Sequence, residues 1–184
     1  MLDNNELTIR QIYLKLLGTR PHVDWKYLII ANNARPRAIF AMRMQLQDKL
    51  ATIDRLTSWD MTVDTKCKLC RVELENRDHL FVFCEFTKTL WKRLLNWINK
   101  TIHIATTWEH HLTWAVANAR EKSQNAQLFR ILYAEYTYAL WEERNQRTFE
   151  NRSRQWDQIA KEIALMCNMR APLGPRTKLQ HPLF

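Results

Sequence analysis

Apolar residues recur along most of this chain at steps of three and four positions, the spacing that places them on one face of an α-helix. The steps are clearest in Leu90–Ile98 and Phe129–Leu140. The spacing predicts helices at residues 9–17, 25–29, 36–46, 53–59, 86–98, 108–119, 123–149 and 154–169. The predicted fold is therefore mainly α-helical.

Residues that favour helix ends flank several of these stretches. Thr8, Asp24 and Thr52 stand where a side-chain oxygen can cap the first turn of a helix. Pro36 occupies a first-turn position, where its missing amide hydrogen leaves no bond unmade. Gly18 follows the first helix at the position that favours a left-handed residue.

Composition excludes several classes of enzyme. The chain has 184 residues but only two glycines, Gly18 and Gly174. Phosphate-binding loops, dinucleotide-binding turns and the nucleophile elbow of hydrolases all need more glycines than this. The acidic residues are scattered along the chain, whereas a nuclease needs clustered carboxylates. We therefore expect a protein without enzymatic activity.

Charge points weakly to an anionic partner. The formal net charge is +9, which is typical of proteins that bind nucleic acid. However, residues 1–60, 61–100 and 101–184 each carry +3, so no part of the chain stands out as a basic tail. Charge alone is equally compatible with a helical protein that has a mildly positive surface.

Nothing in the sequence indicates secretion or a membrane. The start of the chain, Met1–Glu6, is polar and acidic, and no apolar run approaches the roughly 20 residues that span a bilayer. We expect an intracellular protein of the nucleus or cytoplasm, where thiols stay reduced. Four cysteines in that setting do not indicate two disulfides.

The candidate chemistry lies in a polar, broken stretch near the middle of the chain. Cys67, Cys70, His79 and Cys84 form the pattern C-x2-C-x8-H-x4-C, and thiolates and imidazole are the ligands that zinc prefers. Asp78 can cap a short helix that starts at His79. Four protein ligands leave no place for an activated water, so the pattern predicts one structural Zn²⁺. Disulfide pairing and chance core residues are the alternatives.

Three thiolates and a neutral histidine around Zn²⁺ leave a net charge of −1 at the site. Four basic residues lie close in sequence and would offset it: Lys66, Lys68, Arg71 and Arg77.

The same stretch resembles a known family, the zinc-binding domain that follows the reverse transcriptase in plant non-LTR (LINE-type) retrotransposons. The resemblance is carried by Pro36–Phe40, Leu50–Leu56, Trp59, Cys67–Cys70, Glu75, His79–Cys84, Phe86, Leu90 and Trp91. Looser likeness extends upstream to Leu7–Tyr13 and Val23–Trp25, and downstream to Trp141–Phe149. The polymerase itself is not expected here, because its Asp-Asp metal motif is missing from the sequence.

The resemblance implies a non-catalytic module that assists RNA or DNA binding. Its candidate phosphate contacts are Lys66, Lys68, Arg71, Lys88, Lys92 and Arg93. The phenylalanines Phe81, Phe83 and Phe86 could stack on bases, although packing of the metal site against a helix is the favoured interpretation. The alternatives are a helical protein–protein interaction module and a retained retroelement fragment without nucleic-acid affinity.

The predicted organisation has three parts. Residues 1–100 form the helical zinc-binding domain, with a motif core at 36–97, and 101–170 form a helical extension. Residues 105–170 are expected to form a separate hairpin that could bind a protein partner or a second copy. Residues 171–184 form a flexible tail.

Several other residues have ordinary interpretations. His103, His110 and His111 are expected on a polar surface, because no cysteine near them would complete a second metal site. Cys167 is expected to be buried among apolar neighbours. Arg144, Asn145 and an i,i+4 pair of Glu143 with Arg147 are expected to stabilise their helix, the pair by a small amount.

Overall fold

The computed structural model describes residues 8–17, 23–102 and 105–171. It confirms the mainly helical fold. The elements are α1 (Ile9–Leu17), α2 (Lys26–Ile29), α3 (Pro36–Leu46), α4 (Ile53–Ser58), η1 (His79–Phe83), α5 (Glu85–Trp97), α6 (Trp108–Arg120), α7 (Gln124–Asn145), η2 (Gln146–Glu150) and α8 (Trp156–Arg170). The η elements are π-helical turns. Within the described ranges, the only extended pairing is an isolated antiparallel bridge between Lys66 and Leu74.

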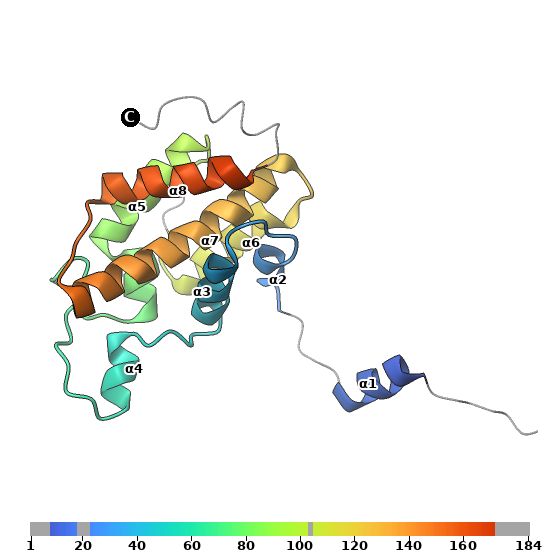
Figure 1. Cartoon of the computed structure of the whole chain (residues 1–184), viewed down its shortest axis with the longest axis horizontal. Coiled ribbons are helices and arrows are strands. Elements are labelled where there is room, and N and C mark those ends of the chain that lie inside the picture. Colours follow the sequence, from blue (N-terminus) through green and yellow to red (C-terminus); the bar gives the residue numbers. More distant parts are fainter. Residues whose placement is uncertain (1–7, 18–22, 103–104, 172–184) are drawn as a thin grey trace, which may run out of the picture.

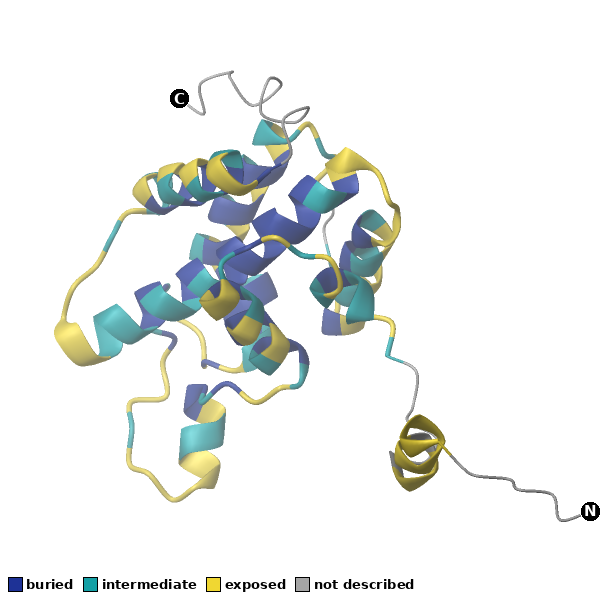
Figure 2. Ribbon diagram, turned by 45° about the vertical axis from the view of Figure 1, so that its right-hand side comes forward, coloured by how far each residue is buried: buried dark blue, intermediate teal, exposed yellow. Residues whose placement is uncertain are grey.

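Helix α7 runs through the middle of the bundle, with α3, α6 and α8 packed against it (Figure 1). Fifteen of its 22 residues are buried, so it appears mostly dark blue in Figure 2. A helix that is apolar on most of its faces needs cover on all of them, which explains its central place. Trp91 of α5 stacks on α7, with ring centroids 4.5 Å from Tyr136 and 6.0 Å from Tyr133.

Helices from both sides of residue 100 share this core, which includes Leu28, Met42 and Leu90 together with Leu132 and Ile163. Residues 105–170 therefore do not form a separate hairpin as expected, because α7 packs against elements that precede residue 100. Helices α3 and α8 pack against α7, and the binding of a partner by residues 105–170 stays a prediction. The domain boundaries themselves stay a prediction, since a shared core does not show where an independent unit begins. The predicted tail lies outside the described residues from 172 onward.

The helix ends confirm some of the predicted caps and correct others. Thr8 Oγ1 accepts from Gln11 N at 3.3 Å, and Gln11 Oε1 accepts from Thr8 N at 2.8 Å, which makes a reciprocal capping box. Asp24 was wrongly expected to cap α2, because that helix begins one residue later and its cap position falls on Trp25. Thr52 holds the cap position of α4, but its side chain makes no capping bond. Gly18 lies outside the described residues.

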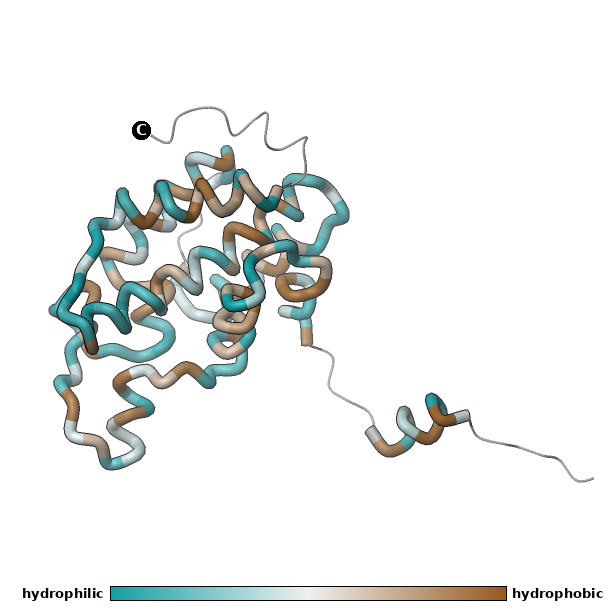
Figure 3. The backbone as a smooth tube through the Cα atoms, viewed as in Figure 1, coloured by the Kyte–Doolittle hydropathy of each residue, from teal (hydrophilic) through white to brown (hydrophobic). Residues whose placement is uncertain are grey.

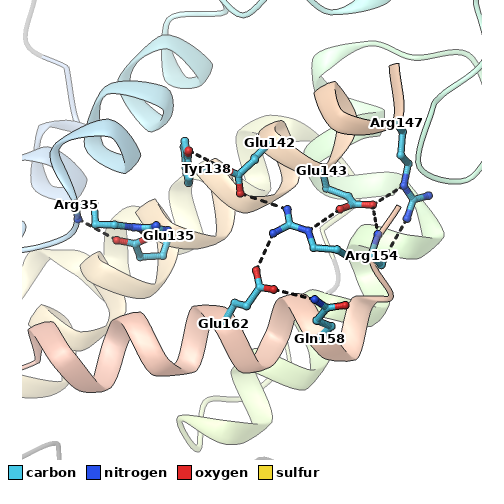
Figure 4. A network of polar contacts seen from close by, with 9 residues as sticks. All are labelled: Arg35, Glu135, Tyr138, Glu142, Glu143, Arg147, Arg154, Gln158 and Glu162. Carbon is cyan, nitrogen blue, oxygen red and sulfur yellow. Dashed lines mark hydrogen bonds and ion pairs between the residues drawn. The ribbon is translucent and has the colours of Figure 1, made fainter. Parts of the chain in front are cut away.

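Two fully buried carboxylates on α7 hold the neighbouring elements in place. Glu135 accepts from Arg35 N at 2.9 Å and pairs with the Arg35 guanidinium at 2.5 Å, at the start of α3. Glu143 pairs with Arg147 at 2.6 Å and with Arg154 at 2.9 Å. Figure 4 shows Arg154 between α7 and α8, where it also reaches Glu162. The Glu143–Arg147 pair is thus part of a largely buried network that also includes Arg154, rather than an isolated pair on the helix surface.

Helix α1 stands apart from the bundle in Figure 1. The helix carries brown, hydrophobic stretches in Figure 3. Its residues Ile9, Ile12 and Leu16 are exposed. None of the helices in the described ranges has the length and apolar composition that a membrane-spanning segment needs.

Candidate metal centre

Two of the candidate ligands lie in the hairpin that the Lys66–Leu74 bridge closes. Cys67 N donates to Glu73 O at 2.8 Å, and Arg71 N donates to Cys67 O at 2.7 Å, so the Cys67–Cys70 turn folds back on itself. Arg71 ends this turn with a φ of 62°. That left-handed conformation costs a residue with a Cβ about 1 kcal/mol, and the backbone bonds of the hairpin offset it.

The other two ligands sit at consecutive helix starts. His79 is the first residue of η1, and Cys84 precedes α5. Asn76, rather than Asp78, caps the first turn, because its Oδ1 accepts from His79 N at 2.7 Å. The helical turn begins before His79, with Leu80 N donating to Asn76 O, so the capping position falls on Asn76. Asp78 instead accepts from Arg77 Nε at 2.8 Å.

The four side chains converge on one point. Their ligand atoms lie within 4.8 Å of one another. Sγ of Cys67 is 3.9 Å from Sγ of Cys84, and Sγ of Cys70 is 3.3 Å from Nε2 of His79. In a tetrahedron with Zn–S of about 2.3 Å and Zn–N of about 2.0–2.1 Å, neighbouring ligand atoms are roughly 3.6–3.8 Å apart. The donor set and its spacing therefore fit a tetrahedral metal ion.

The same distances decide against the disulfide alternative. A disulfide needs sulfurs about 2.05 Å apart, whereas Cys67 and Cys84 are nearly twice as far from each other. All four cysteines, including Cys167, are free thiols in this structure.

The electrostatics of the cluster favour negative charge on Cys84. The Cys67 thiol donates toward Cys84 and is the largest cause that lowers the pKa of Cys84 to about 4. The amides of Phe86 and Thr87 at the start of α5 act in the same direction. In turn, Cys84 raises the pKa of His79 and that of Cys67. A fully buried cysteine whose thiolate form is favoured, next to two further cysteines and a histidine, is an attractive place for a cation.

The geometry agrees with a comparison against protein-family models. Residues 7–91 match the zf-RVT family, described as zinc-binding in reverse transcriptase. The resemblance to a reverse transcriptase zinc-binding domain is thereby confirmed for this segment. The match contains all four cluster residues and covers just under half of the chain. A search of curated proteins and a search of solved structures each found no match.

The zf-RVT segment is braced from outside the matched region by a buried ion pair. Glu75 and Arg144 are 2% and 1% exposed, and Arg144 Nε donates to Glu75 Oε1 at 2.9 Å. Glu75 also accepts from Ile53 N, at 3.1 Å, and from Lys68 N. One carboxylate therefore caps α4, holds the Cys67–Cys70 turn and meets α7. Capping by Glu75 also explains why the Thr52 hydroxyl is not needed there.

Arg147 of η2, the turn that follows α7, supports the same hairpin. Arg147 Nη1 donates to Leu69 O at 2.9 Å, and the guanidinium lies 4.7 Å from the centre of the Phe86 ring. Arg144 and Arg147 both belong to the predicted Trp141–Phe149 motif. The packing role expected for Arg144 is confirmed, but its partner could not be read from the sequence, because Glu75 is 69 residues away.

The candidate phosphate contacts are not equivalent. Lys68 pairs with Asp64 at 2.8 Å, and Arg93 is half-buried. The remaining four are exposed: Lys66, Arg71, Lys88 and Lys92. Among the described residues, none of these four has a carboxylate partner within ion-pair distance.

The predictions for the phenylalanines, the histidines and Cys167 are confirmed in part. Phe81 is buried, and Phe83 and Phe86 are half-buried against the core, so packing is confirmed as the main role of these rings. His111 corrects the expected polar surface, since it is buried and its Nε2 lies 3.2 Å from the Tyr133 hydroxyl. His110 is exposed as expected, and His103 lies outside the described residues. Cys167 is fully buried, as predicted.

Proposed function

We propose that Cys67, Cys70, His79 and Cys84 bind one structural Zn²⁺. The tetrahedral spacing of three sulfurs and one nitrogen supports zinc, and four protein ligands leave no open position for a reacting water. The role of the ion is then to hold the hairpin and the starts of η1 and α5 together. The chain is accordingly a binding module without catalytic activity of its own.

We further propose that this module binds the phosphate backbone of RNA or DNA. The observation that carries the proposal is the set of four exposed cations without carboxylate partners in the described structure, Lys66, Arg71, Lys88 and Lys92. Two flank the metal-binding turn and two lie on α5, directly after the ligand Cys84. In contrast, Arg144 of α7, Arg147 of η2 and Arg154, which precedes α8, are committed to internal ion pairs. The resemblance to LINE-type elements suggests template RNA or target DNA as the natural ligand.

Metal content tests the first part. The purified chain is expected to carry one zinc per molecule, and Cys70→Ser is expected to lose it, whereas Cys167→Ser, remote from the cluster, should keep it. A folded chain that takes up no metal from a zinc-containing buffer would refute the site.

Salt dependence tests the second part. Fluorescence anisotropy with labelled RNA and DNA oligonucleotides should show affinity that falls with salt, with a slope for single strands of about −3 if four cations contact phosphates. Replacing Lys66, Arg71, Lys88 and Lys92 with glutamine should abolish that binding. The matched control replaces exposed lysines elsewhere in the chain, Lys15, Lys49 and Lys122, and should change little. Absence of binding at low salt for the zinc-loaded chain would overturn the proposal.

Protein interaction is the second candidate function. Leu165 and Met169 of α8 are exposed, within the range 105–170 where we expected a partner or a second copy to bind. Size-exclusion mass at several protein concentrations, together with a nuclease-insensitive pull-down, separates this function from nucleic-acid binding.

A further inference from the structure

A pocket of about 440 Å³ lies beside the metal centre, between α5 and α6. That volume falls in the range of small-molecule sites, roughly 300–1,000 Å³. Its wall is mainly apolar and includes Val82 of η1, Trp91 of α5 and Ala105. Two lysines, Lys88 and Lys92, also line it.

The two lysines are placed in a way that the fold itself does not require. They are one helical turn apart on the same face of α5, and both are exposed. Like charges at this spacing weaken a helix slightly. Among the described residues no carboxylate pairs with either of them. The apolar wall complements a flat, apolar group of a ligand, and the two lysines beside it complement a negative charge on the same ligand.

Trp91 adds a second, independent observation. Its side chain is 7% exposed, yet its Nε1 has no acceptor among the described residues. An unsatisfied buried donor destabilises the fold and is rare in native proteins. The ring lines the pocket, and it is held edge-on to His111, whose Nε2 is bonded to the Tyr133 hydroxyl. Because Nε1 itself is buried, the part of Trp91 that meets the pocket is the ring surface rather than this donor.

We propose that this pocket holds one nucleotide of a single-stranded nucleic acid, with the base in the apolar well against Trp91 and its phosphates on Lys88 and Lys92. A base within a duplex is paired and stacked, so only an unstacked base can enter a pocket of this kind. The inference rests on the proposed nucleic-acid binding and specifies where and in which form the strand is held. Single-stranded RNA and DNA share this chemistry.

The test compares single strands with duplexes. The zinc-loaded full chain is titrated into labelled 12-mers, oligo(U) and oligo(dT), and into a DNA hairpin duplex, by fluorescence anisotropy. Ala105→Phe fills the pocket without changing charge and should weaken single-strand binding about tenfold, because a stacked base is lost, while duplex affinity stays the same. Ala117→Phe, at an exposed position of α6, is the matched control. The Lys88→Gln/Lys92→Gln variant should lower the single-strand salt slope by about 1.4.

A measurement on the unaltered chain keeps the proposal testable if Ala105→Phe does not fold. Oligo(dT) with a central 2-aminopurine should change its fluorescence on binding, because the base moves from stacked neighbours into the pocket. Equal loss of single-strand and duplex binding in Ala105→Phe, or an unchanged 2-aminopurine signal in the bound state, would overturn the pocket but leave backbone binding intact. No binding of any oligonucleotide by the wild-type chain would instead overturn the proposed function.

Discussion

The buried pair of Glu75 and Arg144 allows a sharp test of how the metal-binding turn is supported. Glu75→Gln keeps the size of the side chain and removes its charge. Arg144, 1% exposed, would then be a buried cation without its carboxylate. Breaking a buried pair in this way costs about 3–5 kcal/mol. For a domain of this size, the melting temperature should fall by roughly 6–20 °C.

The control is the exposed pair of Glu150 with Arg152, whose side chains are 50% and 79% exposed. Glu150→Gln should change the free energy of unfolding by only about 0–1 kcal/mol, because water already solvates both groups. The double variant Glu75→Gln/Arg144→Met should regain part of the stability, since it no longer buries an unpaired charge. Urea denaturation followed by circular dichroism at 222 nm measures all four proteins.

The same substitution reports on the metal centre. Glu75 accepts from Lys68 N, inside the Cys67–Cys70 turn, so its loss should lower zinc affinity about 10- to 100-fold in a chelator competition. The Glu150→Gln control should keep the wild-type affinity. A loss of stability below 1 kcal/mol in Glu75→Gln, or unchanged zinc affinity, would show that this ion pair does not brace the turn.

Three further predictions concern the metal, the pH and the turn. Chelation of zinc should lower the melting temperature, because Val72 and Leu74 are exposed and the hairpin has little apolar packing of its own. An unchanged melting curve would contradict a structural role for the metal. Burial raises the pKa of Tyr133 and of Tyr136. Since the unfolded tyrosines ionise near pH 10, their contribution should lower stability as the pH rises above 10, and urea midpoints that stay flat from pH 10 to pH 11.5 would contradict this. Arg71→Gly should relieve the left-handed strain by about 1 kcal/mol yet weaken oligonucleotide binding, as measured by denaturation and anisotropy on one sample; stronger or equal binding would remove Arg71 from the phosphate contacts.

The features that could be predicted are those with a local signal. Apolar spacing places α5 and α6 within two residues of their observed ends, and Thr8 caps α1 as expected. The four candidate metal ligands could be recognised from the sequence because their residue types and their spacing both occur within one short stretch of the chain. Their convergence to within 4.8 Å follows from the hairpin and two helix starts that the same stretch encodes.

The features that were missed depend on residues distant in sequence. Glu75, rather than Thr52, caps the first turn of α4. A hydrogen-bonded ion pair with Arg144 holds the Glu75 side chain in place. His111 is buried because the Tyr133 hydroxyl meets it from α7. Nothing near these residues in the sequence signals such partners, since tertiary contacts override local preference. The pocket beside Trp91 likewise arises only when η1, α5 and α6 are packed together.

The central claim is that three thiolates and one imidazole enclose a structural zinc ion. Zinc K-edge X-ray absorption on the purified full chain measures this directly. We expect one shell of three sulfurs at about 2.3 Å and one nitrogen at about 2.0–2.1 Å, without a coordinated water. A folded chain whose zinc is bound mainly by oxygen, or keeps a water ligand, would contradict the account.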